Sequence, residues 1–182
     1  MHSFSGFVKL LKSSSPLKCA QLLTIVVVTM LAGVALYFSQ LMVYTAPDAS
    51  RLMVIEGRVS GYPDSWEHNR SLVHFGVAYK LDGKREGKPI YTYRELYEAS
   101  RLRINSKVVL TVERVDEGSR VRELATLDGR ILYDDRLGQQ VVLWNNESIR
   151  STVILGCLAS IGTAVAAVVM LARHQRGIGL QG

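Results

Sequence analysis

The chain has 182 residues, 48% of them hydrophobic, and its 22 basic and 16 acidic residues give a formal net charge of +6. All acidic residues lie between Asp48 and Glu147. The segment from Ala46 to Ile149 contains as many basic residues, Lys and Arg counted together, as acidic ones, so it is close to neutral. The positive excess therefore sits beside two long apolar runs near the chain ends, which is typical of membrane flanks and excludes a nucleic-acid partner from our expectations.

The N-terminal tail, residues 1–18, is basic and contains apolar residues at helical spacing. This pattern allows a short interfacial helix lying on an anionic lipid surface, and equally a disordered basic tail. The residues concerned are Phe4, Phe7, Val8, Leu11, Lys9 and Lys12.

Two uncharged runs, Leu22 to Tyr44 and Thr152 to Leu171, are long enough to cross a bilayer core, which takes about 20 helical residues. We expect transmembrane helices at 19–44 and 150–172, and the first run is too long for the apolar part of a signal peptide. Lys and Arg near the tails favour cytoplasmic termini, including the tail 173–182, with residues 45–149 on the outer side of the membrane. Cys19 and Cys157 would lie near opposite membrane faces, too far apart for a disulfide.

Both predicted spans carry small residues at four-residue spacing, which lets helix backbones approach closely. Such faces serve either the packing of the two spans on each other or contact with another subunit, and the sequence leaves both open. The residues are Thr29 and Gly33 in the first span and Gly156, Ser160, Gly162 and Ala166 in the second.

The segment 45–149 carries strand patterns separated by turn residues. One face of the strand expected near Leu52–Tyr62 would carry Val54, Glu56, Arg58 and Ser60. The segment Lys107–Val115 alternates cleanly between apolar and polar residues, as a half-buried strand does. Asp128-Gly129 is a strong signal for a hairpin turn. Further strands are expected at Leu52–Tyr62, Leu72–Leu81, Lys88–Thr92, Val121–Leu127 and Arg130–Tyr133.

Two helices are expected in this segment. One follows Thr92, which has capping-box spacing to Glu95, and the other begins near Asp135 and runs through Trp144 into the second span. The predicted fold is an α+β membrane protein. Two transmembrane helices flank a small extracytoplasmic β-barrel-like domain of five or six strands with one inserted helix.

Two apolar spans enclosing EGRV, a strand ending in KLDGK and a strand of the KVVLTVER kind resemble a bacterial family of unknown function. Its members carry a small β-barrel between two transmembrane helices. The resemblance covers the spans and the segment from Val54 to Val115, and this chain adds YTYRELYEASRL before the KVVLTVER strand. The resemblance implies this fold and a bacterial inner membrane with residues 45–149 in the periplasm. The family has no agreed catalytic residues, so none can be transferred to this chain.

No catalytic or cofactor-binding motif is present, and we expect no cofactor, metal ion or enzymatic activity. His68 and His74 are the candidates for any metal or acid-base chemistry, but a metal site needs three or four convergent ligands. We expect His74 to be a hydrogen-bonded sheet residue. Asp134 and Asp135 suit strand-end or helix N-cap positions better than a carboxylate pair.

Tyr62 and Trp66 lie in the polar stretch GYPDSWEHNR, so they either contact a partner or lipid headgroups or plug one end of the barrel. Asn69 and Asn146 match the glycosylation pattern on the expected outer side. The leading hypothesis is a non-enzymatic membrane protein, in contact with lipid, whose β-domain and helix faces bind another envelope protein. It would be an accessory subunit or an immunity-type protein. A homo-oligomeric pore or scaffold, and an envelope enzyme using His68 or His74, are the alternatives.

Overall fold

The computed structural model describes residues 15–116 and 118–179, with side chains through Arg176. The interfacial helix predicted for the N-terminal tail falls on residues outside this part of the chain. The elements are α2 (Pro16–Phe38), η1 (Ala49–Arg51), β1 (Leu52–Val59), β2 (Asp64–Ser65), β3 (Leu72–Leu81), β4 (Lys84–Tyr93), α3 (Arg94–Ser100), β5 (Lys107–Val115), β6 (Gly118–Thr126), β7 (Ile131–Tyr133) and α4 (Asp135–Gly179).

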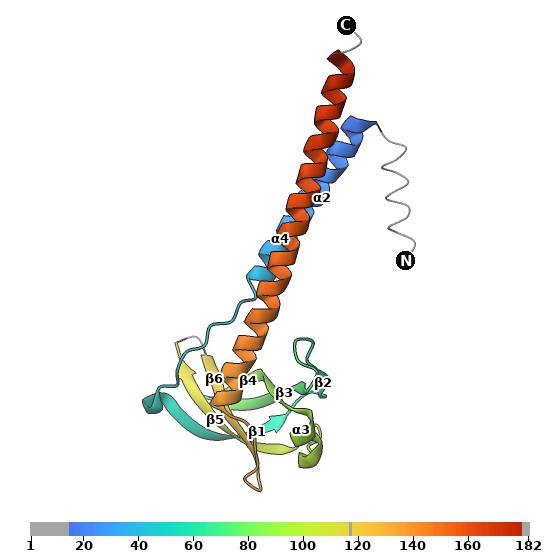
Figure 1. Cartoon of the computed structure of the whole chain (residues 1–182). Coiled ribbons are helices and arrows are strands. Elements are labelled where there is room, and N and C mark those ends of the chain that lie inside the picture. The colour runs from blue at the N-terminus through green and yellow to red at the C-terminus, as the bar shows by residue number, and fades with distance from the viewer. Residues whose placement is uncertain (1–14, 117, 180–182) are drawn as a thin grey trace. The chain divides into compact units, whose positions relative to one another are not determined.

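The chain divides into two compact units. The helical unit comprises Met1–Leu41 and Ser148–Gly182, and the β unit comprises Met42–Glu147. The helix α4 is continuous and contributes to both, as the sequence predicts from the absence of a helix stop in WNNESIR. The result is an α+β chain with two long apolar helices and one antiparallel sheet (Figure 1).

In the helical unit, α2 and α4 lie side by side in opposite directions (Figure 1). The helices are in close contact at Gly156 of α4, because a Cβ placed there would lie only 2.5 Å from Cγ2 of Val34 in α2. Toward the other end of the pair, Leu17 of α2 and Leu171 of α4 line the same groove. Both helices are long and apolar enough to cross a membrane, judged by length and composition. The predicted first span continues to Tyr44, but α2 ends at Phe38 and an extended segment follows.

The β unit is a seven-stranded antiparallel sheet that curls into a half-barrel, with α3 inserted between β4 and β5. Its strand order is β2-β3-β1-β5-β6-β7, and β4 pairs with β3. The bounds of β3 and β5 match the sequence prediction, whereas β4 is longer than the predicted strand at Lys88–Thr92. A tight hairpin joins β3 directly to β4 because Asp82 and Gly83 take positive φ angles of 50° and 77°.

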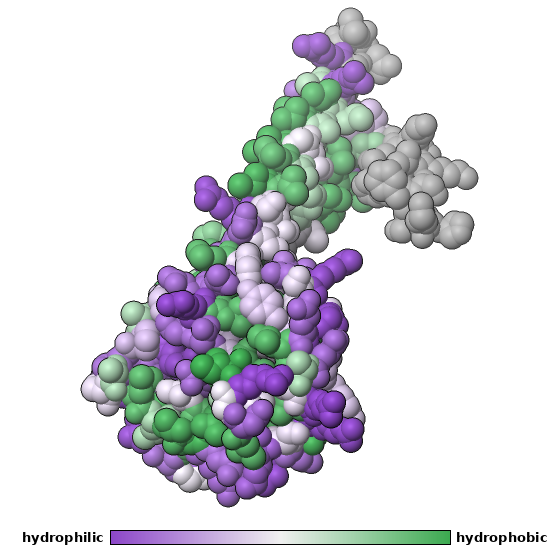
Figure 2. All heavy atoms as spheres, turned by 60° about the horizontal axis from the view of Figure 1, so that its bottom comes forward, coloured by the Kyte–Doolittle hydropathy of each residue, from purple (hydrophilic) through white to green (hydrophobic). Residues whose placement is uncertain are grey.

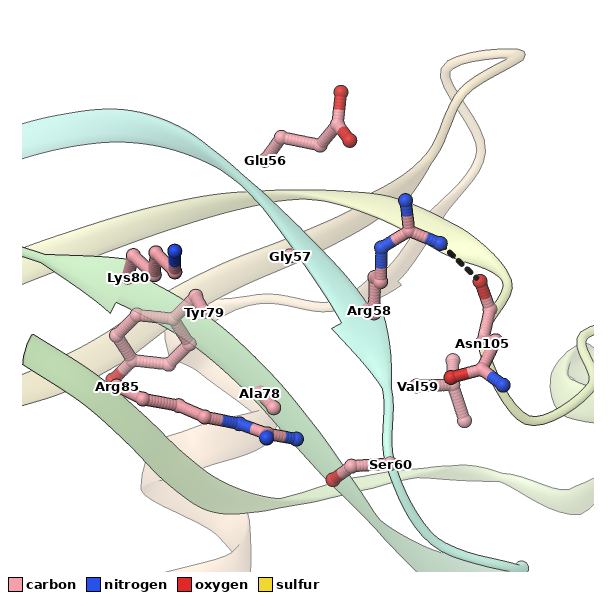
Figure 3. Close-up of a pocket in the computed structure, with 10 residues that line it drawn as sticks. All are labelled: Glu56, Gly57, Arg58, Val59, Ser60, Ala78, Tyr79, Lys80, Arg85 and Asn105. Carbon is pink, nitrogen blue, oxygen red and sulfur yellow. Dashed lines mark hydrogen bonds between the residues drawn. The ribbon is translucent and has the colours of Figure 1, made fainter.

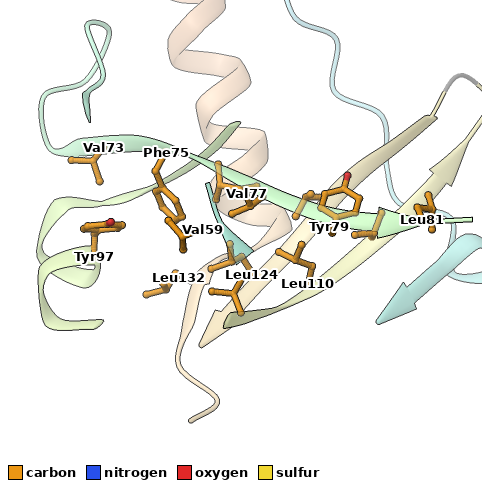
Figure 4. Close-up of a cluster of buried hydrophobic side chains, with 14 residues drawn as sticks. Val59, Val73, Phe75, Val77, Tyr79, Leu81, Tyr97, Leu110, Leu124 and Leu132 are labelled. Carbon is orange, nitrogen blue, oxygen red and sulfur yellow. The ribbon is translucent and has the colours of Figure 1, made fainter. Parts of the chain in front are cut away.

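The core of the β unit lies on the inner face of the curled sheet (Figure 4). Alternate residues of β3, including Phe75, Val77 and Tyr79, point into it, because successive side chains of a strand face opposite sides. The strands β5 and β6 supply Leu110 and Leu124 from across the sheet. The domain therefore has a core of its own, as expected from a segment without cysteines.

Side chains join the two ends of the curled sheet. The Thr92 hydroxyl of β4 donates a hydrogen bond to the Leu132 carbonyl of β7 (2.5 Å), and Ser119 of β6 bonds to Glu86 of β4 and to the Tyr79 hydroxyl. The predicted capping box at Thr92 is therefore wrong. Tyr93 is the residue that precedes α3, and its side chain makes no cap hydrogen bond.

The Thr92→Val substitution should lower the free energy of unfolding of the β unit by about 1–3 kcal/mol. It keeps the side-chain shape but leaves the buried Leu132 carbonyl without its donor. Thermal unfolding of the full-length protein in detergent, followed by circular dichroism, measures the change. Thr111→Val, at a half-buried strand position, is the matched control and should be close to neutral. Equal stability of the two variants would contradict a stabilising role for the hydrogen bond that joins β4 to β7.

Candidate functional site

An open pocket of about 430 Å³ lies on the outer face of the sheet, between β1 and the β3-β4 hairpin (Figure 3). Strand alternation places it there. Gly57 and Val59 of β1 are buried in the sheet, whereas the side chains of Glu56, Arg58 and Ser60 project outward. The sequence predicted this shared face of β1, although not the pocket beside it.

Three cations line the pocket: Arg58 of β1, Lys80 of β3 and Arg85 of β4. Lys80 and Arg85 form a cross-strand pair on the hairpin, so two like charges lie directly opposite each other. The carboxylate that lines the pocket, Glu56, is already paired with Lys107 at 2.9 Å. No carboxylate in residues 15–116 or 118–176 forms an ion pair with the three cations, so the pocket is electropositive.

The pocket opens where two strands separate. β1 pairs with β3 only from Gly57 to Val59, while it pairs with β5 from Leu52 to Arg58. The part of β1 from Leu52 to Glu56 therefore has no strand partner on its β3 side among the described residues. Ala78, whose small side chain leaves space, also lines the pocket, and the Arg58 guanidinium donates a 3.3 Å hydrogen bond to the Asn105 carbonyl.

A second polar arrangement is a buried charge network around Arg122. The guanidinium contacts Glu113 at 2.5 Å and Asp135 at 3.1 Å, and it donates to the Thr45 carbonyl at 2.7 Å. Tyr44 completes the network, because its hydroxyl donates to Asp135 and its ring faces the guanidinium at 5.9 Å. The network links the extended segment after α2, the sheet and the first turn of α4 within the β unit.

A β-bulge points Arg122 into the network. Thr111 pairs with Glu123 and Val112 pairs with Val121, so Arg122 is the extra residue between two consecutive pairs. Bulges re-aim side chains in this way. Sequence alternation alone therefore misplaces Arg122, and we did not predict the network.

Glu113 lies in this network, and its pKa has two opposing influences. Burial raises the pKa of the carboxyl, but hydrogen bonds from the Asp48 N–H and from Arg122 outweigh burial and hold it below its ordinary value of 4.5. A lowered acid pKa contributes stability that is fully present above the ordinary value and lost as pH falls through the folded-state value.

The β unit should therefore lose stability progressively below about pH 4.5, the ordinary pKa of this carboxyl. Glu113→Gln should make the protein less stable at neutral pH and weaken its dependence on acid. Melting temperatures measured across pH in detergent test this. Glu95→Gln removes an exposed carboxylate on α3 and should leave the pH profile as in the parent protein. An undiminished acid dependence in Glu113→Gln would contradict the assignment.

The predicted contact residues Tyr62 and Trp66 are placed very differently. Tyr62 is 82% exposed, whereas Trp66 is 6% exposed and packs with Leu72, Leu137 and Val141 in a second hydrophobic cluster. Trp66 therefore plugs one end of the sheet beneath α4, the alternative that the sequence left open. Tyr62 remains a surface residue.

The two histidines lie in an aromatic cluster. The Trp66 ring contacts His68 and Tyr91, and His74 lies 6.0 Å from Tyr91. The expectation of a hydrogen-bonded His74 is wrong, because its buried Nδ1 has no hydrogen-bond partner. No group of three or more metal-ligating side chains occurs within the described part of the chain. Asp134 caps α4, as predicted, by accepting a hydrogen bond from the Leu137 N–H.

The side chain of Asn146, the acceptor residue of a glycosylation motif, is hydrogen-bonded to the backbone of Met42 within the β unit. Its side-chain amide donates to the Met42 carbonyl at 2.8 Å, and its side-chain oxygen accepts from the Met42 N–H at 2.9 Å. The nitrogen that would carry a glycan is therefore engaged. At Asn69, the side-chain oxygen accepts from the Ser71 N–H and stabilises a turn.

The six small residues predicted for helix packing fall into two groups. Gly156 faces Val34 of α2, and Ser160 is buried with its hydroxyl bonded to the Gly156 carbonyl. The other four are exposed on the outside of the helix pair, and no atom lies within 4 Å of a Cβ placed on either of the two glycines among them. They are Thr29, Gly33, Gly162 and Ala166.

The motifs behind the family resemblance correspond to simple structural features. KLDGK forms the turn between β3 and β4, and KVVLTVER lies in β5. No protein-family model, curated protein sequence or solved structure matches the chain.

Proposed function

We propose that the chain is a non-enzymatic membrane-anchored binding protein. Its helices α2 and α4 span a bacterial inner membrane, both termini lie in the cytoplasm, and residues 45–149 form a periplasmic domain. This domain binds another envelope protein, as an accessory subunit or an immunity-type protein.

The observation that carries the proposal is the exposed apolar surface of the helical unit. Ile25, Leu36, Leu155 and Val168 are each more than three-fifths exposed, and hydrophobic colour covers most of the helix pair in Figure 2. Water disfavours apolar surface of this extent, whereas lipid tails accept it. At 1.5 Å per residue, α2 measures about 35 Å, enough for a hydrocarbon core of about 30 Å.

The binding role is supported by the electropositive pocket on the outer sheet face. A pocket lined by cations without acidic partners favours an anionic group on another molecule. The β unit has its own core, so this face is not needed to complete the fold.

Crosslinking in cells followed by purification from native membranes tests the proposal. We expect a specific envelope protein to be recovered covalently attached to the β unit. A protein that remains in the membrane fraction, runs as a lone monomer in mild detergent and crosslinks to nothing would contradict it.

A homo-oligomeric scaffold is the second candidate, favoured by the outward position of Gly162 and Ala166 on α4. Small residues on an exposed helix face allow close packing with a second copy. Gly162→Leu should then reduce the particle to monomer mass in mild detergent, as measured by light scattering. Leu158→Ile, at an exposed position on the same helix, is the control. An unchanged monomeric mass in both variants and the parent would remove this candidate.

A further inference from the structure

We infer that the pocket beside β1 receives an acidic, extended segment of a protein partner, which adds a strand to the unpaired edge of β1 and places carboxylates among the cations. The inference rests on the proposed function and names the chemistry of the partner. It joins two observations in one place: an exposed strand edge and an electropositive pocket at its end (Figure 3).

The backbone of β1 presents hydrogen-bonding groups toward the pocket. Val59 bonds toward β5, through the Ser106 carbonyl and the Asn105 N–H, whereas the Ser60 N–H bonds to the Gly76 carbonyl of β3. Successive strand residues direct their backbone groups to opposite edges, so Val54 and Glu56 direct theirs to the same side as Ser60. No strand occupies that side next to them among the described residues, and an added strand would satisfy these groups.

The cations select the side chains of the added strand. Side chains of an added strand alternate between two faces, so every second one would project on the outer face, where Arg58, Lys80 and Arg85 lie. Carboxylates accept charge-assisted hydrogen bonds from guanidinium and ammonium groups. A membrane surface or a phosphate polymer would also supply anions, but neither has N–H and C=O groups spaced to pair with the strand edge.

Binding of defined peptides to the full-length protein in nanodiscs of neutral lipid tests the inference. The probe is an acetylated, amidated octapeptide of alternating Glu and Val, and its binding is followed by fluorescence anisotropy. We expect saturable binding that slows amide hydrogen exchange in residues 52–56. Replacing Glu by Gln in the peptide, or N-methylating its backbone on alternate residues, should weaken binding by about tenfold or more.

Variants of the protein locate the site. Arg58→Gln and Lys80→Gln should each weaken peptide binding by about tenfold. Arg130→Gln removes the same charge at an exposed turn and should leave binding unchanged. Three results would overturn the inference: no peptide binding, equal binding of the N-methylated peptide with competition by polyphosphate, or slowed exchange only on nanodiscs of anionic lipid.

A photocrosslinking amino acid in cells separates this inference from the proposed function. Position Val54, which is 70% exposed on β1, tests the edge, and Leu127, exposed at the β6-β7 turn, tests a distant surface. A partner captured only at Leu127 would rule out the pocket beside β1 as the binding site and leave the proposed function standing. Capture at neither position, together with no partner from general crosslinking, would instead overturn the proposed function.

Discussion

Replacing Arg122 by Met should destabilise the β unit by about 3–5 kcal/mol, which at roughly 4 °C per kcal/mol lowers its melting temperature by about 12–20 °C. The side chains of Arg122 and Glu113 are only 7% and 6% exposed, so the substitution leaves a buried carboxylate without its counter-charge. Thermal unfolding in detergent, where the apolar helices stay folded, measures the loss.

A double variant distinguishes the loss of charge balance from a general packing defect. Arg122→Met combined with Glu113→Leu removes the two buried charges and leaves Asp135, which is 36% exposed, to be solvated by water. The double variant should therefore recover most of the stability, because an apolar pair avoids the cost of burying ions. Arg130→Met, at an exposed turn, is the control and should be neutral within about 0.5 kcal/mol. If the double variant were less stable than Arg122→Met alone, charge balance would not be the reason.

The Trp66→Ala substitution should cost about 3–5 kcal/mol, as large aromatic truncations in cores do. The indole packs against Tyr91 and, beneath α4, against Leu137 and Val141, so its loss opens a cavity. Tyr62→Ala is the matched control, since Tyr62 is 82% exposed and should change stability by no more than about 0.5 kcal/mol. Chemical unfolding monitored by circular dichroism compares the two. Similar losses would contradict the placement of Trp66 in the core.

Local pattern predicted the elements whose residues alternate cleanly. β3 and β5 match their predicted bounds because each alternates inward and outward side chains over nine or ten residues. The continuous α4 was predicted because its sequence contains no stop between Asp135 and the apolar run. The start of β4 was missed, since the charged residues Lys84 and Arg85 at the tip of the hairpin, both exposed, conceal the strand pattern.

Contacts between distant residues account for what the sequence did not reveal. The helix α2 ends at Phe38, and Tyr44 and Thr45 in the extended segment that follows form hydrogen bonds in the Arg122 network. Thr45 and Arg122 are 77 residues apart in the sequence, so a local pattern does not reveal this contact. The pocket likewise needs the early separation of β1 from β3, which is a property of tertiary pairing. The outward face of β1 was predicted, but its neighbours Lys80 and Arg85 were not.

The central claim, a β unit held on the outer side of a membrane by two spanning helices, is tested most directly by cysteine labelling. Cys19 and Cys157 would be replaced by Ala, and a single cysteine introduced by Asp128→Cys in the β6-β7 turn or by Arg176→Cys at the end of α4. A membrane-impermeant maleimide should label Asp128→Cys in intact spheroplasts, and Arg176→Cys only after the membrane is opened. Labelling of Arg176→Cys in intact spheroplasts, or recovery of the protein in the soluble fraction, would contradict the claim.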